Sequence, residues 1–373
     1  MADRILAVRL DAIGDFILWL DAARALRTLY PPGRYHLTLL GNRAWATLAR
    51  EIGCFDEVWQ LDRRRFVLNP FYRFRILRRV AAGGFSVTIH PTFCRDFLWG
   101  DAVVRASGAP ERIGFAGSTE LLTPVQRLVS DRWYTRLIHR SPSESTTQLR
   151  RNAEFVRGLG VTDFGLRTPW LEPTAPPPAD IGAEPFYILC PGASHAIRQW
   201  PVGNFVRIAE LISRHTGWRG LVCGAGAETG IAGRLVGEAS ARLENYAGKT
   251  TLTGLVSIIS RARLLVGNES GPIHLAAALG TPCVSVVGGG HFGQFLPYET
   301  YDGEVRPSPV VAAYPMECFG CGWSCRYNPA AGACAPCLTN ITVEEVWSKT
   351  LTLITNELNG RRGMQFDADA EAR

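Results

Sequence analysis

The sequence predicts an α/β protein built from two doubly wound parallel sheets. Short runs of apolar residues alternate with segments of helical periodicity along most of the chain. The apolar runs are continuous, which is typical of strands buried on both faces of a parallel sheet. A proline-rich stretch divides these runs into two sets, and 373 residues are enough for two cores.

The first half of the chain contains four predicted strands. RILAVRL at 4–10 is followed by a helix over 16–30, which ends at Pro31–Pro32. Further strands are predicted at 36–41, 58–61 and 85–90, and further helices over 44–52 and 148–159. We assign residues 1–167 to one Rossmann-like domain.

The composition changes at residues 168–185, which hold six prolines and predict a stiff linker. Beyond it we expect strands at 186–190, 220–223, 263–267 and 282–288, and helices near 203–215, 228–240, 252–260 and 271–279. A second Rossmann-like domain is therefore assigned to 186–358, including a small Cys-rich module at 314–340, with a tail at 359–373. The two domains are expected to face a central cleft, with ligands at the carboxyl ends of the strands.

Composition narrows the function classes. The chain is 46% hydrophobic and 20% charged, as in soluble globular proteins. No apolar run reaches the ~20 residues of a membrane-spanning helix, and no signal-peptide pattern opens the sequence, so we expect a cytoplasmic protein. The net charge of +6 suits an anionic small ligand or a membrane surface but is low for nucleic-acid binding.

Five of the ten cysteines are packed into one short segment, with the spacing C-x2-C-x3-C-x8-C-x2-C. In a reducing cytoplasm such spacing favours a metal over disulfides. We expect a structural zinc or iron held by four of the five, without a catalytic role. Free or packed thiols are the alternative. The five are Cys318, Cys321, Cys325, Cys334 and Cys337.

The loop after the first predicted strand carries a candidate general base. In RLDAIGDFILWL (9–20), Gly14 permits a tight turn and Asp15 stands at the start of the following helix. An aspartate there can simply cap the helix. In a partly desolvated cleft, its pKa would instead rise enough to take a proton from a sugar hydroxyl.

Two loops of the second half are candidates for a nucleotide site. After the strand at 186–190, the small residues Pro191–Ser194 let backbone N–H groups approach an anion, and Arg198 is the candidate cation. A plain surface turn is the alternative. In VCGAGAETG (222–230) the third glycine of a dinucleotide fingerprint is missing; Glu228 would accept hydrogen bonds from ribose hydroxyls or cap a helix.

A third loop joins the strand at 263–267 to a helix that begins at Gly271–Pro272. A proline in the first turn preorganises the helix, and the helix N-terminus attracts an anion. Asn268–Ser270 precede it, and His274 lies about one turn into it. That histidine either faces the loop or packs in the core.

Together these loops resemble glycosyltransferase family 9, the ADP-heptose:lipopolysaccharide heptosyltransferases. The resemblance spans most of the chain and is carried by RLDAIGD, by CPGASHAIRQWP and by NYAGKTTLTGLVSIISRARLLVGNESGPIHLAAALGTPCVSVVGG (245–289). Its most specific parts are the turn Gly248–Thr250, the helix that follows and SGPIHLAAALGTP. The resemblance implies a GT-B fold with the acceptor on the N-terminal side. It also implies an inverting transfer from ADP-heptose that needs no metal or other cofactor.

The resemblance also implies residue roles. Asp15 matches the family's proposed catalytic base, Arg198 stands where a lysine often lies near the donor phosphates, and Glu228 falls near the ribose-binding carboxylate. The implied donor-binding set is Gly192, Ser194, Arg198, Glu228, Glu269, Ser270, Gly271 and His274. Glu269 departs from the usual aspartate by one methylene, and Arg198 offers a planar fork in place of an ammonium. Both departures bear on which sugar is the donor.

The leading interpretation is a heptosyltransferase acting in lipopolysaccharide core assembly. One alternative keeps the fold and donor but modifies a protein acceptor, as in relatives that glycosylate autotransporters. Another is a non-catalytic nucleotide-binding scaffold, which the intact Asp15 and donor block disfavour. A nicotinamide dehydrogenase is disfavoured because no G-x-G-x-x-G follows the first strand.

An arginine-rich segment, DRRRFVLNPFYRFRILRR (62–79), lies in the expected acceptor domain. Its arginines, interleaved with Phe66, Phe71, Tyr72 and Phe74, would meet phosphates and acyl chains of a lipid-linked acceptor at the inner face of the cytoplasmic membrane. A solvated helix face is the alternative. The expected contacts are Arg63, Arg64, Arg65, Arg73 and Arg75.

Overall fold

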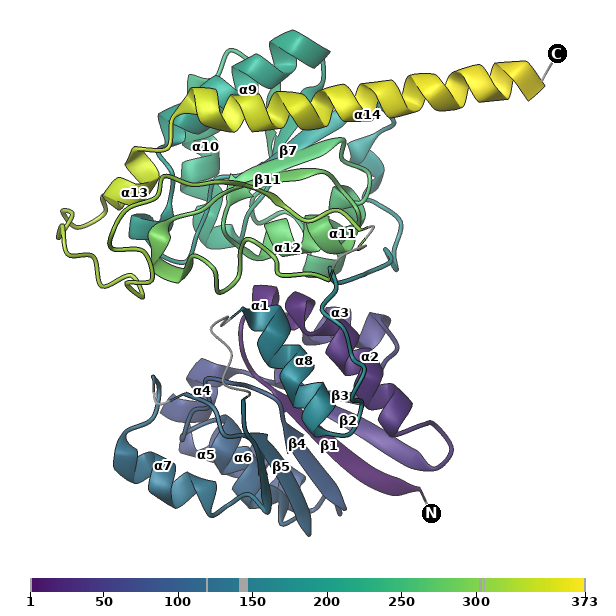
Figure 1. Cartoon of the computed structure of the whole chain (residues 1–373), viewed down its shortest axis with the longest axis vertical. Helices are drawn as coiled ribbons and strands as arrows, with labels where there is room; N and C mark the ends of the chain where they lie inside the picture. Colours follow the sequence, from purple (N-terminus) through teal and green to yellow (C-terminus); the bar gives the residue numbers. More distant parts are fainter. Residues whose placement is uncertain (1, 119, 141–146, 302–303, 305, 372–373) are drawn as a thin grey trace. The chain divides into compact units, whose positions relative to one another are not determined.

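The chain, described here as a computed structural model, folds into two compact units (Figure 1). The structure describes residues 2–118, 120–140, 147–301, 304 and 306–371. The N-terminal unit extends to Pro169 and includes the short segment that begins at Glu299; the C-terminal unit runs from Trp170 to Tyr298 and resumes after that segment. Among the described residues, no helix is long and apolar enough to cross a membrane.

The N-terminal unit contains a six-stranded sheet in the order β3-β2-β1-β4-β5-β6, with every neighbouring pair parallel. Its strands are β1 (Asp3–Arg9), β2 (Tyr35–Asn42), β3 (Glu57–Leu61), β4 (Val87–His90), β5 (Glu111–Phe115) and β6 (Arg136–Ile138). β1 is central because Ile5–Arg9 are buried on both faces, as its continuous apolar run predicts.

The helices among the described residues of this unit are α1 (Ile13–Leu18), α2 (Leu20–Leu29), α3 (Ala46–Glu51), α4 (Arg63–Leu68), α5 (Pro70–Ala81), α6 (Gly100–Ser107), α7 (Pro124–Asp131) and α8 (Gln148–Gly158). α8 packs against α1 and α2, whereas α5 packs against α6, which lies on β1 and β4 (Figure 1). This arrangement confirms a doubly wound unit and sets the loop after β1 beside α8.

Two predictions for this unit need correction. The single helix expected over 16–30 is two helices that meet at Trp19. The arginine-rich segment, in which Phe66 and Tyr72 were expected to meet acyl chains, forms two helices, because Asp62 caps α4 through the Arg65 N–H (3.0 Å) and Asn69 caps α5 through the Tyr72 N–H (2.9 Å). Phe66 on α4 and Tyr72 on α5 are buried, so they belong to the core rather than to a surface.

The C-terminal unit repeats the same winding in a second six-stranded parallel sheet, ordered β12-β11-β10-β7-β8-β9. Its strands are β7 (Phe186–Cys190), β8 (Arg219–Val222), β9 (Leu243–Asn245), β10 (Leu264–Asn268), β11 (Cys283–Val286) and β12 (Val310–Ala312). The four strands predicted for this half match β7, β8, β10 and β11. The short edge strands β9 and β12 were not predicted.

The helices of this unit are α9 (Val202–Thr216), α10 (Thr229–Glu238), α11 (Leu252–Ile259), α12 (Gly271–Ala278), α13 (Pro336–Thr339) and α14 (Val343–Glu371). α9 packs against α10 and α14, and α11 packs against α12 (Figure 1). In α12, Ala276–Ala278 are buried, and these small side chains let the helix approach β10 and β11 closely.

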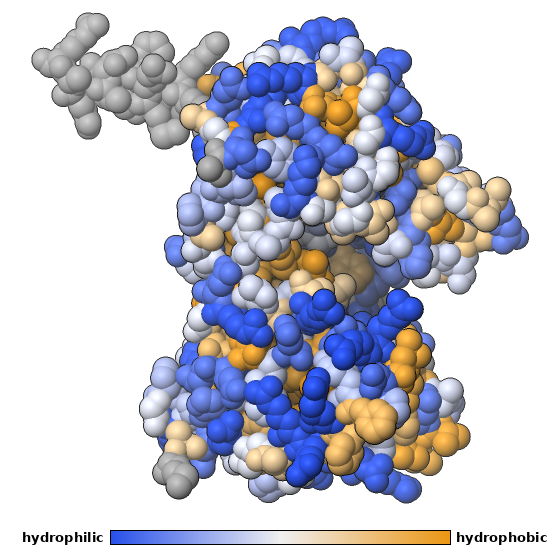
Figure 2. Space-filling model, turned by 180° about the vertical axis from the view of Figure 1, so that it is seen from behind, coloured by the Kyte–Doolittle hydropathy of each residue, from blue (hydrophilic) through white to orange (hydrophobic). Residues whose placement is uncertain are grey.

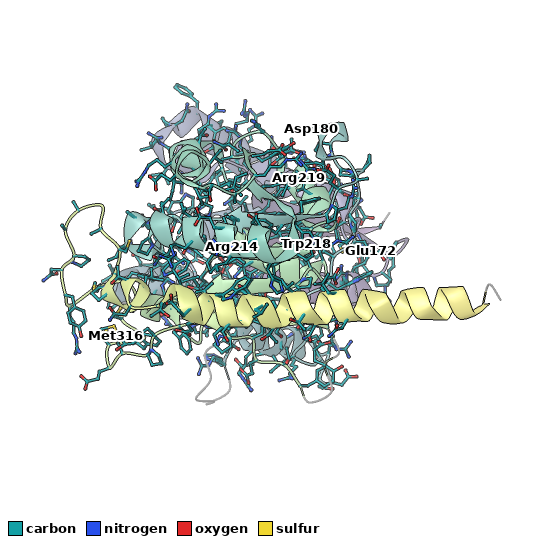
Figure 3. The ribbon with its side chains drawn as sticks, turned by 90° about the horizontal axis from the view of Figure 1, so that it is seen from above. Glu172, Asp180, Arg214, Trp218, Arg219 and Met316 are labelled. Carbon is teal, nitrogen blue, oxygen red and sulfur yellow. The ribbon has the colours of Figure 1, made fainter. Side chains whose placement is uncertain are left out.

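The proline-rich stretch is packed onto the C-terminal unit. The Leu171 N–H donates to the Ala278 carbonyl (2.8 Å), and the Ser257 hydroxyl donates to the Ala175 carbonyl (2.6 Å). The Tyr246 hydroxyl donates to the Asp180 carboxylate (2.7 Å), and Arg219 donates to the neighbouring Ile181 carbonyl (Figure 3). These contacts order a segment whose composition alone predicts only stiffness.

Candidate active site

Asp15 lies in the first turn of α1, directly after β1. The N-cap of this helix is Ala12, and no side chain caps it. Asp15 is therefore not the N-cap residue itself, but its carboxylate accepts a hydrogen bond from the Ala12 backbone N–H, so the capping interpretation still applies beside a catalytic one.

The surroundings of Asp15 adjust its proton affinity. Burial raises the pKa of Asp15 to about 7, the nearby Asp11 carboxylate adds to this rise, and Arg9 opposes it. Arg9 is itself fully buried and pairs with Asp11 at 2.6 Å. Its guanidinium also donates to Asn152 of α8 (3.3 Å). Because Arg9 is already paired with Asp11, it lowers the pKa of Asp15 only partly. With a pKa of about 7, the Asp15 carboxyl group can gain or lose a proton near neutral pH, which is what a general base requires.

In the C-terminal unit, the loops after β7 and β10 are joined by Asn268. Its side-chain oxygen accepts from the Trp200 N–H (3.0 Å), and its amide donates to the Pro191 carbonyl (2.7 Å). Asn268 is fully buried at the end of β10. Sequence reasoning placed it in the polar cluster but missed this role; an amide at the end of an otherwise apolar strand was the available signal.

Glu228 links the loops after β7 and β8. Its carboxylate accepts from the Ala225 N–H (2.6 Å), so it does cap the short turn that precedes α10. The same carboxylate lies against two glycines: a Cβ built on Gly192 would come within 1.9 Å of its Oε1, and one on Gly224 within 2.5 Å of its Oε2. The Gly248 turn joins this group, because its N–H donates to the Gly224 carbonyl (2.9 Å).

Arg198 and Glu269 form the charged centre of this unit's loops. An Arg198 Nη donates to the Ser194 hydroxyl (3.1 Å), and the other lies 3.8 Å from the Glu269 carboxylate. Glu269 is only 6% exposed, and within the described part of the chain neither of its carboxylate oxygens has a hydrogen-bond partner. Burial raises the pKa of Glu269 to about 7, and Arg198 only partly offsets the rise.

The remaining predicted donor residues fall into two groups. Ser270 is the N-cap of α12 and Gly271 its first residue, so both lie at the helix N-terminus beside Glu269. His274 is buried in the core, where its Nδ1 pairs with the Tyr298 hydroxyl (2.8 Å), and burial lowers its pKa to about 4. His274 is therefore neutral and held by packing, which matches the core alternative.

The arginine-rich helices of the N-terminal unit present a mixed surface. Arg63 stacks over Trp99, and Arg73 stacks over Phe66 and donates to the Leu98 carbonyl (2.8 Å), so both are anchored. Arg64, Arg65 and Arg75 are exposed. Beside them, Phe71 is 86% exposed and Phe74 64% exposed, and hydrophobic side chains stand among hydrophilic ones on this unit's surface (Figure 2).

The cysteine-rich segment packs against the loop after β11. Cys337 is buried and its sulfur accepts from the Gly289 N–H (3.3 Å), whereas Cys318, Cys321, Cys325 and Cys334 are partly exposed. In the described residues, no three Cys, His, Asp or Glu side chains gather closely enough to hold a metal ion. The thiols as placed therefore do not form a ligand set.

Comparison with known proteins identifies the family. The model of glycosyltransferase family 9 (heptosyltransferase) matches residues 96–309. The lipopolysaccharide heptosyltransferase 1 of Pseudomonas aeruginosa is 31% identical over 340 residues, which cover 87% of this chain and 88% of that protein.

Solved structures share the fold. The E. coli ADP-heptose LPS heptosyltransferase II superposes with a TM-score of 0.68 at 16% identity, covering 95% of this chain and 99% of that one. The dodecameric iron-containing heptosyltransferase TibC of enterotoxigenic E. coli, in complex with ADP-D-β-D-heptose, gives a TM-score of 0.57 at 16% identity and covers 95% of this chain and 77% of that one. The expected GT-B architecture is confirmed by these likenesses, and the chain belongs to glycosyltransferase family 9, the heptosyltransferases.

Proposed function

We propose that this heptosyltransferase moves a heptose from ADP-heptose to a hydroxyl of the lipopolysaccharide core, with inversion at the anomeric carbon. The observation that carries the proposal is the buried Glu269 carboxylate, which lacks hydrogen-bond partners in the described chain and lies 3.8 Å from the Arg198 cation. An unpartnered buried carboxylate is costly unless a ligand supplies donors. Sugar hydroxyls and a diphosphate are the groups that such a pair would bind.

In this proposal the leaving group is held by the C-terminal unit. Arg198 would pair with the diphosphate, Glu269 would accept from donor hydroxyls, and Glu228 would accept from the ribose. The N-terminus of α12 at Gly271 would add a favourable partial charge. These groups favour the transition state because negative charge builds on the diphosphate as its bond to the sugar breaks.

The N-terminal unit would supply the base. The acceptor oxygen attacks the anomeric carbon and loses its proton to the Asp15 carboxylate, while the bond from that carbon to the diphosphate oxygen breaks and ADP departs. One displacement inverts the anomeric configuration. A pKa of about 7 suits Asp15 to this proton transfer. The name of the matched Pseudomonas relative and the donor bound to TibC support the choice of heptose and ADP.

The direct test is transfer in a defined mixture. The protein would be incubated with ADP-heptose and a lipopolysaccharide core acceptor that lacks heptose, and the product analysed by mass spectrometry and by NMR of the new anomeric centre. A heptosylated acceptor of inverted configuration supports the proposal. Faster turnover of UDP- or GDP-sugars would overturn the donor assignment.

A protein is the second acceptor class, an alternative that the cysteine-rich segment keeps open. If the acceptor is a protein, the same donor should yield a heptosylated autotransporter protein, and the lipid acceptor should remain unmodified. Running both acceptors in parallel separates the two alternatives.

Two further expectations remain part of this proposal. The exposed face of α4 and α5 would contact an anionic membrane, because residues 63–81 include arginines and exposed phenylalanines but no acidic residue.

The cysteines would bind a structural zinc or iron, which their spacing supports. Because the thiols do not form a ligand set as placed, binding requires them to move together. Metal analysis of protein purified without chelators tests this: no stoichiometric metal would refute it.

A further inference from the structure

The cysteine-rich segment is built into the loop that follows β11. The N–H groups of Gly320 and Gly322 donate to the carbonyls of Gly289 (2.8 Å) and Gly290 (3.0 Å). A Cβ on Gly289 would come within 2.3 Å of the Phe319 ring, and one on Gly290 within 2.4 Å of the Trp323 ring. The glycines of this loop therefore leave the space that two aromatic rings fill. Met316, near the start of the segment, also packs on the core (Figure 3).

Trp323 is held in one orientation. Its indole N–H donates to Nδ1 of His291 (3.3 Å). Its backbone φ is +67°, a left-handed conformation that costs a bulky residue about 1 kcal/mol or more. A tryptophan in this conformation persists only where its surroundings fix it.

The ring of Trp323 reaches the donor loop. The guanidinium carbon of Arg198 lies 5.1 Å from its centroid, within the range of a cation–π interaction. The segment also contacts the donor loop a second time, because the Ala335 N–H donates to the Ile197 carbonyl (3.1 Å). Arg198 thus has Trp323 on its face, with Ser194 at 3.1 Å and Glu269 at 3.8 Å at its edges.

We propose that Trp323 is a positioning residue of the donor site: its ring holds the Arg198 guanidinium in the plane in which that fork binds the donor diphosphate. This inference rests on the proposed function, because the phosphate role of Arg198 belongs to that proposal. Arginine has several rotatable bonds, and fixing them before the ligand arrives reduces the entropy lost on binding. The cysteine-rich segment thereby acts on donor affinity through Trp323.

The test is a double-mutant cycle read by calorimetric titration of ADP. Trp323→Leu should weaken ADP binding about 3- to 10-fold, the range expected for loss of a partly desolvated cation–π contact. It should raise KM for the nucleotide sugar and leave kcat nearly unchanged. Trp323→Phe keeps an aromatic face and should restore most of the affinity. Tyr327→Leu is the matched control, since this exposed ring stacks only on Arg326 among the described contacts.

The Arg198→Gln background separates positioning from general support of the fold. There, Trp323→Leu should cause no further loss of ADP affinity, because the group that the ring orients is gone. An equal loss in both backgrounds, or wild-type affinity in Trp323→Leu, overturns the inference. Should Trp323→Leu fail to fold, the same cycle with Trp323→Met, which keeps much of the side-chain volume but has no aromatic face, decides. If the wild-type protein does not bind ADP at all, it is the proposed function that fails.

Discussion

In each sheet the first strand lies between the second and the fourth: β1 between β2 and β4, and β7 between β8 and β10. The loops after β1 and β7 therefore occupy equivalent positions in two similar scaffolds, yet they carry different chemistry. The first presents Asp15 beside a cation already paired with Asp11. The second presents Arg198, whose nearest carboxylate, Glu269, is 3.8 Å away.

The comparison extends to the two carboxylates. Burial raises the pKa of both Asp15 and Glu269 to about 7. Asp15 is partly exposed and has Asp11 as a like-charged neighbour, so it can exchange its proton with an incoming hydroxyl. Glu269 is buried with both oxygens unpartnered in the described chain, so it is suited to accept hydrogen bonds. Under the proposed function, carboxylates of equal proton affinity would serve as a base in one unit and as a binding group in the other.

The largest expected effect concerns Asp15 and pH. Because its carboxylate must be deprotonated to act as the base, kcat/KM should rise with pH and level off above about 7. Below that value the rate should fall about tenfold per pH unit. Steady-state assays between pH 5 and 9 measure this profile. The fall in kcat/KM should persist in Glu269→Gln, which lacks the other carboxylate that titrates near 7. A flat profile in that variant would show that the pH dependence comes from Glu269 and not from Asp15.

Glu269→Gln should weaken the donor site without removing the base. Loss of hydrogen bonds to a charged group costs about 1.5–3 kcal/mol, which is roughly a 10- to 100-fold rise in KM for the nucleotide sugar. The expected change in kcat is small. Glu244→Gln is a suitable control, because Glu244 pairs with Arg219 away from these loops. An unchanged KM would remove Glu269 from the donor site.

Stability should respond to pH through Glu269. The folded pKa of about 7 lies above the ordinary glutamate pKa of 4.5, so the folded state binds more protons between these values. The free energy of unfolding of the unliganded protein should therefore fall as pH rises from about 4.5 to 7, by on the order of 3 kcal/mol. Urea unfolding of the wild type and Glu269→Gln measures the difference. Parallel pH curves for the two proteins would contradict this account.

The smallest expected effect is on the surface of the N-terminal unit. Replacing Phe71 and Phe74 by serine should reduce co-sedimentation with anionic vesicles several-fold and leave ADP binding unchanged. Tyr314→Ser removes an exposed ring from the C-terminal unit and should have no effect. Binding that is equally strong to neutral vesicles would argue against the charge-based contact.

Much of the scaffold could be predicted because its central strands are continuous apolar runs. β1, β7 and β10 read directly from RILAVRL, FYILC and RLLVG. β5, β6 and β9 were missed because they are short and mix polar with apolar residues, and β12 was missed because it has only three residues. Whether a segment of three residues forms an edge strand depends on its pairing with a neighbouring strand, and that pairing cannot be read from a single sequence.

The candidate site was predictable where a residue type alone implies its chemistry. Asp15, Arg198 and Glu269 follow strands and were named from the sequence. The roles of Asn268 and Trp323 were not, because each depends on partners distant in sequence: Asn268 joins Pro191 and Trp200, and Trp323 faces Arg198. Such contacts arise only when loops from different strands meet.

The central proposal is that the N-terminal unit supplies the base and the C-terminal unit binds the donor. Its most direct test is Asp15→Asn, with ADP affinity and heptose transfer measured on the same preparation. The amide keeps the shape of the side chain but cannot take a proton. We expect an ADP Kd equal to that of the wild type and transfer reduced by about 100-fold or more. Transfer at the wild-type rate, or loss of ADP binding together with transfer, would contradict the assignment of chemistry to one unit and donor binding to the other.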